Sequence, residues 1–302
     1  MNRFNAPDGT PLVFDAYEPP APGPRAAVLF LHGWSDHAGR WIPTAQGLRD
    51  ARFATYLLDQ RGHGRSGGRR GHLSRFSQLL GDLQAFRRAV RARTAAPQVL
   101  LGHSFGALVV LRYLETQPGD PPAAAVASSP WLGLPTRAPA WKRVVARLLA
   151  DLWPTLPVSA GLDADHLSRD PAVNAAWAAD PACHDRMTTG AWAEIQWAQR
   201  AVVADGERID CPVLFLLAGE DRVVDAHLAR AFADGLKGAE IRWYPEMLHE
   251  VLNDPQNPAW DFIDRPAAIA ALDRFGELAA WERIELFGAA TAAIWLGEDL
   301  GV

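Results

Sequence analysis

The sequence predicts an α/β protein with a doubly wound, mostly parallel sheet and an inserted helical cap. Short apolar runs that suit buried parallel strands alternate with segments of helical period. Each run ends in a turn-forming or polar residue, and this alternation is typical of a doubly wound sheet. The expected strands are Ala26–Leu31, Ala54–Leu58, Val99–Leu101, Ala123–Ala127, Val213–Ala218 and Ile241–Tyr244.

The segments beside these runs fit the same fold. Apolar residues recur every three or four positions from Phe76 to Val90, as on one face of an amphipathic helix. Near the start of the chain, Asp8-Gly9 separates two short stretches in the manner of a tight hairpin. We therefore expect the sheet to begin with an antiparallel pair.

One stretch breaks the alternation of strands and helices. Residues 130–200 are rich in Ala, Trp and Pro and lie between two expected strands, as an inserted cap does. They divide the core into residues 1–129 and 201–302, and the second part ends in a helical tail from about residue 282. The tail run GAATAAIWL is too short to span a bilayer. The tail can pack on the body of the protein, join a partner subunit or touch a membrane surface. We favour packing on the body.

Composition and charge exclude several classes of protein. The 302-residue chain has a net charge of -5 and a pI near 6.0, which gives no long-range attraction to nucleic acid. Cys183 and Cys211 have neither CxxC spacing nor a companion histidine cluster, so we expect reduced packing residues and no metal site. The N-terminus lacks a signal sequence and no apolar run reaches about 18 residues, which predicts a cytoplasmic protein without a membrane span.

The motif Gly-His-Ser-Phe-Gly at residues 102–106 carries the predicted chemistry. Ser104 lies between a strand-like run and a helix-like run, and a sharp turn there lifts a serine hydroxyl out of the sheet. Such a turn requires minimal side chains two residues to either side, where Gly102 and Gly106 stand. The pentapeptide recurs by chance, but its strand and helix context identifies Ser104 as a candidate nucleophile.

A serine nucleophile needs a base, and the base needs an orienting acid. When the serine occupies this kind of turn, the acid and then the histidine follow it in the chain, on loops after late strands. Asp221 follows the run CPVLFLLAG and His249 follows IRWYPEML, so we predict that they are the acid and the base. The alternatives are Glu220 and Asp225 as acids and His227 as base.

Acyl transfer also requires two preorganised N–H donors for the oxyanion. The N–H of Phe105, at the start of the expected helix, is one candidate. The other is the N–H of Trp34, because His32-Gly33 ends an earlier strand and places Trp34 in the following turn.

Taken together, these segments resemble the monoacylglycerol lipase and lysophospholipase branch of the α/β-hydrolases, often labelled serine aminopeptidase S33-like. The resemblance implies an α/β-hydrolase fold, a triad of Ser104, Asp221 and His249, and oxyanion donors at Trp34 and Phe105. It also implies hydrolysis of fatty-acid esters of glycerol-type alcohols without a metal or organic cofactor. The matching stretches, in the family's order, are PDGTPL, LFLHGWSDHAGRW, LLDQRGHGRSGGRRGHLSRFSQLLGDL, LLGHSFGALVVL, LAGEDRVVD and LHEVLND.

The chain departs from the family in two motifs. Many members have GHSMGG, where this chain has Phe105 and Ala107, and we expect Phe105 to narrow the acyl pocket. Proline iminopeptidases, which are also similar, usually carry HGGPG where this chain has HGWSD, which argues against peptidase activity. Ser104 excludes a haloalkane dehalogenase, which needs a carboxylate nucleophile. A thioesterase, an acyltransferase and a non-catalytic ligand-binding protein remain as alternatives.

Two further features bear on the substrate. Half of the twelve tryptophans fall within the expected cap, which favours a hydrophobic ester, although packing of small helices explains any single one. The loop Arg61–His72 carries four arginines among glycines. Two interpretations of this loop are open. Arg69 or Arg70 contacts an anionic head group of the substrate, or the loop is solvated and hydrogen-bonded within itself. We favour the second. The six tryptophans of the expected cap are Trp131, Trp141, Trp153, Trp177, Trp192 and Trp197.

Overall fold

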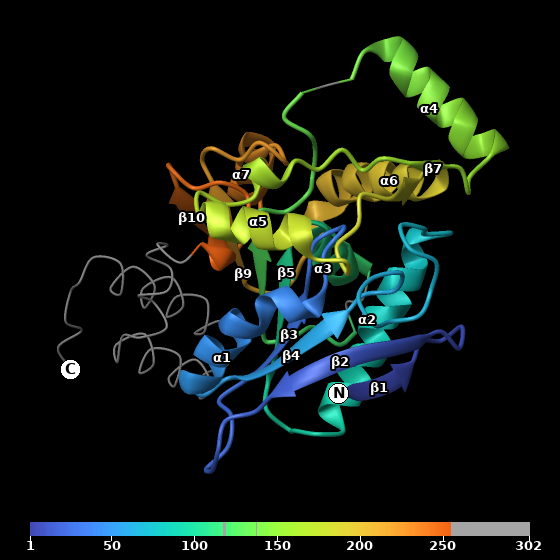
Figure 1. Ribbon diagram of the computed structural model, residues 1–302. Helices are drawn as coiled ribbons and strands as arrows, with labels where there is room; N and C mark the ends of the chain where they lie inside the picture. The colour runs from blue at the N-terminus through green and yellow to red at the C-terminus, as the bar shows by residue number, and fades with distance from the viewer. Residues whose placement is uncertain (117–118, 137, 255–302) are drawn as a thin grey trace.

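A sheet of eight strands forms the centre of the computed structural model, which describes residues 1–116, 119–136 and 138–254 (Figure 1). The strand order is β1-β2-β4-β3-β5-β6-β9-β10, and all neighbours from β4 to β10 are parallel. All of the predicted strands are present. The strands are β1 (Asn2–Asn5), β2 (Pro11–Tyr17), β3 (Ala27–Leu31), β4 (Ala54–Asp59), β5 (Gln98–His103), β6 (Ala124–Ser128), β9 (Val213–Ala218) and β10 (Ala239–Tyr244).

The sheet begins with the predicted antiparallel hairpin. Strand β1 pairs with β2, and β2 pairs antiparallel with β4. Between the first two strands, the Ala6 N–H donates to the Thr10 carbonyl over 2.9 Å, and Gly9 adopts a φ of 82°. That left-handed conformation is the reason for a glycine in this turn.

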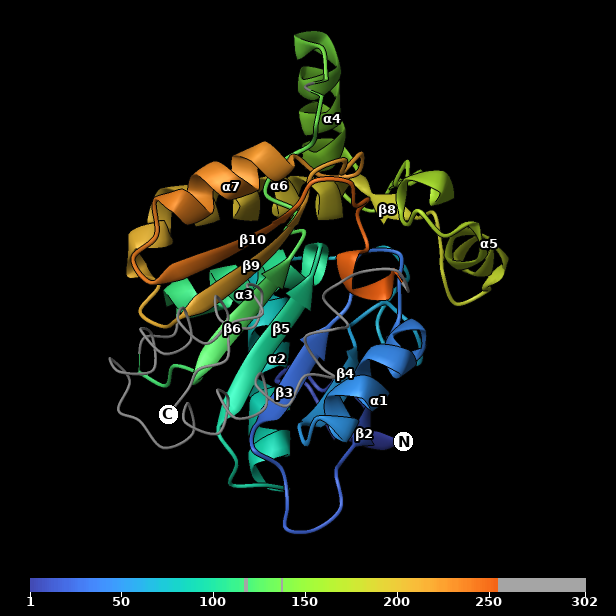
Figure 2. The same ribbon diagram turned by 90° about the vertical axis from the view of Figure 1, so that its left-hand side faces the viewer.

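Helices cover both faces of the sheet, and the side-chain alternation of the strands explains how. In β3, Ala27, Leu29 and Leu31 pack into the core with α2, α3, α6 and α7, whereas Val28 and Phe30 pack on the opposite side with α1. Figure 2 shows α1 in front of the sheet and α2 and α3 behind it. These helices are α1 (Ile42–Asp50), α2 (Phe76–Arg91), α3 (Phe105–Thr116), α6 (Thr189–Asp205) and α7 (Ala226–Asp234).

The segment between β6 and β9 folds mostly as helices above the carboxyl ends of the parallel strands (Figure 1). Helix α6 packs against α3 and continues to Asp205, past the boundary expected at residue 200. The division of the chain at residues 130 and 200 therefore stays a prediction. The other elements are α4 (Ala140–Leu152), α5 (Pro171–Ala179), paired strands β7 (Pro157–Val158) and β8 (Met187–Thr188), and 3₁₀ turns Ala38–Trp41, Ala164–His166, Gly206–Arg208 and Val251–Asn253.

The predicted helical tail lies outside the described residues. Within the part that is described, no helix combines the length and the apolar character needed to cross a membrane. Cys183 and Cys211 are free, and burial raises the pKa of each thiol to about 12.

The start of α3 lies very close to the end of β3. A Cβ atom added to Gly106 would lie 2.2 Å from the carbonyl oxygen of Leu31 and 2.7 Å from that of His32. A Cβ atom added to Gly102 would lie 2.5 Å from the backbone of Ala107. Because backbone atoms surround both positions, close packing requires the two glycines of the motif.

Replacing Gly106 by alanine should destabilise the protein by about 1–3 kcal/mol or more. The added methyl group would clash with backbone atoms, which cannot move aside as the end of a flexible side chain can. Thermal unfolding measures the effect. The matched control is Gly119→Ala, whose added Cβ meets no atom within 4 Å and should leave the transition unchanged. A Gly106→Ala protein with the thermal midpoint of wild type contradicts this account of the motif.

Candidate active site

Ser104 occupies the turn between β5 and α3. Its φ of 53° lies in the left-handed region, which costs a residue with a side chain about 1–3 kcal/mol. Two hydrogen bonds hold the turn: the Ser104 N–H donates to the Ser128 carbonyl over 2.8 Å, and the Ser104 carbonyl accepts from the Trp131 N–H over 3.2 Å. The surrounding strands and loops therefore maintain a serine conformation that an isolated turn disfavours.

His249 and Asp221 lie together at the same end of the sheet. His249 Nδ1 is 2.8 Å from Asp221 Oδ2, so a proton on Nδ1 is donated to the carboxylate and Nε2 is left as an acceptor. The second oxygen of Asp221 accepts the N–H groups of Val223 and Val224, each over 2.9 Å. The aspartate is thus oriented by backbone donors, and it orients the histidine. Ser104 and His249 line one pocket.

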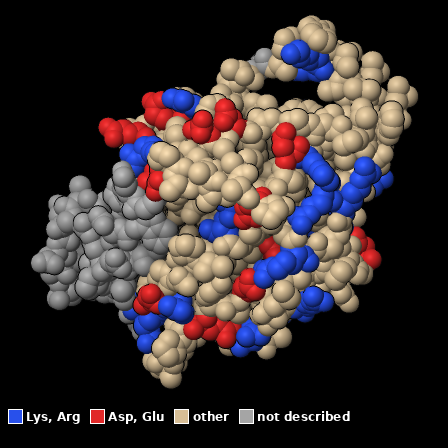
Figure 3. All heavy atoms as spheres, viewed as in Figure 1, with Lys and Arg blue, Asp and Glu red and all other residues tan. Residues whose placement is uncertain are grey.

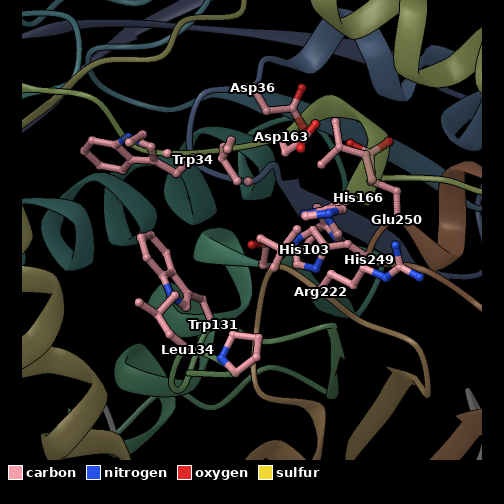
Figure 4. Close-up of a pocket in the computed structure, with 18 of the residues that line it drawn as sticks. Trp34, Asp36, His103, Trp131, Leu134, Asp163, His166, Arg222, His249 and Glu250 are labelled. Carbon is pink, nitrogen blue, oxygen red and sulfur yellow. The ribbon is translucent and has the colours of Figure 1, made fainter. Parts of the chain in front are cut away.

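This pocket has a volume of about 230 Å³ and two unlike sides. Figure 4 shows Trp34, Trp131 and Leu134 on one side, and His166, Arg222 and Glu250 with His249 on the other. Further lining residues from the segment between β6 and β9 are Pro135, Thr136, Ala160, Gly161, Leu162, Asp163, Leu167 and Trp177. An apolar group and a polar group can therefore bind at the same time.

The two predicted oxyanion donors stand where β3 and α3 meet. Gly33 lies against the nucleophile turn, since a Cβ added to it would lie 3.5 Å from Ser104 Cβ. Across the described part of the chain, neither the Trp34 N–H nor the Phe105 N–H donates to another protein group. Both donors are thus available to a bound ligand.

Buried histidines around this turn were missed by sequence reasoning. His32 Nε2 accepts the Gln60 N–H over 3.1 Å, and His63 Nε2 accepts the Ser35 N–H over 3.3 Å. Burial is the main cause that lowers the pKa of His32, and it lowers the pKa of His63 and of His103 well below the ordinary value. They are therefore neutral and act as hydrogen-bond acceptors and packing groups. The motif RGHGRS at residues 61–66 gives no indication of this burial.

An ion-pair network joins the segment after β3 to the residue that follows His249. Arg40 donates to both carboxylate oxygens of Glu250, over 2.7 and 2.8 Å, and to Asp36 over 3.2 Å. Burial opposes ionisation of Asp36, but the charge of Arg40 and the hydrogen bonds from the Trp41 indole and the His37 N–H act together against it, so that the pKa of Asp36 lies below its usual value. The carboxylates of Asp36 and Glu250 therefore bind Arg40, although both residues also line the pocket.

The alternative candidates for the acid and the base, Glu220, Asp225 and His227, lie outside the pocket. Asp225 caps α7, accepting the Leu228 N–H over 2.9 Å. His227 is exposed on α7, with its ring 5.4 Å from that of Trp243, and Glu220 is exposed. None of the three rivals lines the pocket.

The arginine loop is held by its own contacts. Arg61 pairs with Asp82 over 2.5 and 2.6 Å, and Arg65 pairs with Asp59 over 2.6 Å. Arg69 donates to the Thr155 carbonyl over 3.2 Å, and Arg70 donates to the Gly64 carbonyl over 2.8 Å. No arginine of this loop lines the pocket, which agrees with the hydrogen-bonded loop that we favoured; the lining arginine is Arg222.

The aromatic predictions are only partly met. Of the cap tryptophans, Trp131 and Trp177 line the pocket, and Trp192 packs against Trp131 with ring centroids 6.1 Å apart. The expectation that Phe105 narrows the pocket is wrong. Its ring is 1% exposed and packs behind Trp34 at 4.9 Å, because the turn directs it into the core.

His37, Asp180 and Cys183 each offer a metal-ligand atom within 4.8 Å of the others. However, His37 Nδ1 accepts the Gly39 N–H over 3.1 Å, which places the proton on Nε2, and Nε2 donates to Asp180 over 2.9 Å. Burial also keeps the Cys183 thiol protonated, with a pKa of about 12. A hydrogen bond between the core and the cap accounts for this cluster.

The buried histidines predict a loss of stability in acid. Burial, and then the charge of Arg70, lowers the pKa of His184 from 6.5 to about 4. Between these values the unfolded chain binds more protons than the folded one, so the free energy of unfolding falls as the pH drops below about 6.5. Urea unfolding at pH 7.5 and pH 5 should show a lower midpoint in acid, and His184→Gln should reduce that difference.

The matched control for this measurement is His227→Gln, at an exposed histidine, which should keep the wild-type difference. A His184→Gln protein with the full wild-type drop contradicts the assignment.

Comparison with known proteins identifies the family of the chain. Fold and site define an α/β-hydrolase, and the chain is a carboxylic ester hydrolase. A family model described as serine aminopeptidase, S33, matches residues 22–256, and the chain belongs to that family.

Several similar proteins are named as lipases. The chain is 33% identical over 259 residues to the monoacylglycerol lipase of Mycolicibacterium smegmatis, which covers 84% of this chain and 91% of that protein. It is 26% identical to the phospholipase YtpA of Bacillus subtilis, over 77% of this chain and 91% of the relative. The solved monoacylglycerol lipase of Paleococcus ferrophilus superimposes with a TM-score of 0.76 at 29% identity, over 87% of this chain and 99% of that one.

Proposed function

We propose that the protein hydrolyses esters between a hydrophobic acyl group and a glycerol-type alcohol, with Ser104 as nucleophile, His249 as base and Asp221 as acid. The observation that carries the proposal is the 2.8 Å contact of His249 Nδ1 with Asp221, where His249 lines one pocket together with Ser104. Residues 130–200 act as a cap over this pocket and supply much of its lining.

In the proposed mechanism, His249 Nε2 takes the Ser104 proton as the hydroxyl oxygen attacks the ester carbonyl carbon. The Trp34 and Phe105 N–H groups bind the resulting oxyanion, and Asp221 stabilises the imidazolium. The intermediate collapses to an acyl-enzyme as His249 protonates the leaving alcohol. Water, deprotonated by His249, then attacks the acyl-enzyme, and release of the carboxylic acid restores Ser104.

The two sides of the pocket support the choice of substrate. The side formed by Trp34, Trp131 and Leu134 suits an acyl chain, and the opposite side, with His166 and Arg222, suits a hydroxylated alcohol. The names of the relatives from Mycolicibacterium smegmatis and Bacillus subtilis support a monoacylglycerol first and a phospholipid second. Arg222 favours the second candidate, since it is a cation on the polar side of the pocket.

A substrate panel tests the proposal. Purified protein should hydrolyse medium- and long-chain monoacylglycerols faster than acetyl esters, because only the longer chains fill the apolar side of the pocket. Ser104→Ala should abolish turnover and labelling by a fluorophosphonate, and Asp221→Asn should lower kcat by about 10⁴ through loss of the histidine orientation.

The matched control for Asp221→Asn is Asp225→Asn at the helix cap nearby, which should keep near-normal kcat. Turnover by Ser104→Ala, or turnover restricted to acetyl esters, contradicts the mechanism or the substrate respectively.

Helix α4 supports a peripheral encounter with lipid. It projects from the body (Figures 1 and 2), and Ala150 is its only buried residue. Large apolar side chains on it are 45–82% exposed, and three basic residues lie among them. In Figure 3 its surface is largely neutral with basic atoms. The exposed apolar residues are Trp141, Val144, Val145, Leu148 and Leu152, and the basic residues are Lys142, Arg143 and Arg147. We propose that α4 docks on an anionic lipid surface.

Vesicle sedimentation tests this docking. Val145→Asp combined with Leu148→Asp should lower partitioning onto vesicles of phosphatidylcholine and phosphatidylglycerol more than tenfold, because each exposed side chain contributes about 1–3 kcal/mol when buried. The control is Val203→Asp on α6, at a residue that is 46% exposed. Equal sedimentation of the double variant and wild type contradicts a role for α4.

A further inference from the structure

The loop that carries the Trp34 N–H is bound directly by the cap. We call residues 33–37 the oxyanion loop and residues 184–186 the clasp. The Trp34 indole Nε1 donates to the Arg186 carbonyl over 3.1 Å. The His184 N–H donates to the Ser35 carbonyl over 3.4 Å. Two consecutive residues of the oxyanion loop therefore depend on the clasp for hydrogen bonds.

The conformation of Ser35 explains why the oxyanion loop needs such support. Ser35 is completely buried and has a φ of 64°, in the left-handed region that a residue with a side chain adopts only when its surroundings hold it there. Its N–H donates to His63 Nε2 over 3.3 Å, and the His63 ring lies 4.9 Å from the ring of His184. Ser35 is thus held at its N–H by His63 and at its carbonyl by the clasp.

Further contacts position the clasp itself. His37, at the end of the oxyanion loop, donates to Asp180 of the cap over 2.9 Å. On the other side of the clasp, the Thr188 N–H donates to the Gly71 carbonyl over 2.8 Å. A Cβ added to Gly71 would lie 2.4 Å from the Arg186 carbonyl oxygen, so the arginine loop packs directly under the clasp.

We propose that the clasp holds the Trp34 N–H in position for the oxyanion, so that docking of the cap on the core sets the rate of the chemical step as well as access to the pocket. The proposal rests on the function assigned to Ser104. In it, the Trp34 indole and the His63 ring are positioning residues, which act through the backbone of the oxyanion loop.

The coupling is reciprocal by thermodynamic linkage. If the docked clasp stabilises the oxyanion-binding conformation, a group bound in the oxyanion site stabilises the docked clasp by the same factor. A fluorophosphonate adduct on Ser104 places a phosphonyl oxygen at that site, and should therefore slow amide exchange in the cap, remote from the covalent bond.

The first test is Trp34→Phe, which removes the indole donor and keeps an aromatic ring beside Phe105 and His63. With p-nitrophenyl butyrate, a small ester, kcat should fall about tenfold, the effect of one lost hydrogen bond, while KM changes less than twofold. The matched control is Trp197→Phe on α6, at a side chain that is 47% exposed, which should leave both constants unchanged.

The second test distinguishes the hydrogen bond that His63 accepts from the space that its ring fills. His63→Gln keeps a carbonyl oxygen that can accept the Ser35 N–H, whereas His63→Leu leaves that N–H without an acceptor. At equal thermal stability, His63→Gln should retain a kcat several-fold above that of His63→Leu at similar KM. Equal kcat values for the two variants overturn the role of His63.

The third test does not depend on turnover. Hydrogen exchange should be faster in Trp34→Phe than in wild type, both in residues 33–37 and in residues 182–188, and slower in residues 182–188 after fluorophosphonate labelling. Unchanged exchange of residues 182–188 in Trp34→Phe overturns the proposal, as does a kcat within twofold of wild type. If wild type neither hydrolyses esters nor is labelled, the function of Ser104 fails, and the exchange data still decide whether the clasp and the oxyanion loop are coupled.

Discussion

The approach of Gly106 to the carbonyl oxygens of Leu31 and His32 is the constraint on which the site depends. It brings the first turn of α3 against the end of β3, and the loop after β3 lies against the turn at Ser104, since a Cβ added to Gly33 would lie 3.5 Å from Ser104 Cβ. At this turn Ser104 has a φ of 53°, in the left-handed region. The proposed nucleophile and the loop with the proposed oxyanion donor Trp34 therefore meet where two backbone segments pack closely.

A second constraint joins segments that are far apart in the chain. Arg40 follows the oxyanion loop and Glu250 follows His249, and the two form a buried bidentate pair across 210 positions of sequence. Burying such a pair costs desolvation, so its contribution to net stability is small, but loss of one partner leaves an uncompensated charge. The pair therefore favours a single arrangement of the two loops that carry His249 and Trp34, the proposed base and oxyanion donor.

Local patterns predicted the parts of the molecule that depend on local rules. Apolar runs gave the strands, Asp8-Gly9 gave the hairpin, and the order of motifs gave Ser104, Asp221 and His249, of which the last two are hydrogen-bonded. The neutral state of His63, the inward direction of Phe105 and the contacts of the clasp were not predictable. Each depends on burial between segments separated by tens to more than a hundred residues, and periodicity carries no information on such contacts.

Helix α4 contributes one buried residue, Ala150, to the body of the protein. Its outer face is therefore free of the packing demands that restrict sequence change elsewhere. In an evolving lineage, or in an engineered enzyme, the residues of that outer face can change while the face packed against α6 and the residues proposed for catalysis stay the same. The surface on which such an enzyme works can then diverge independently of the bond that it cleaves.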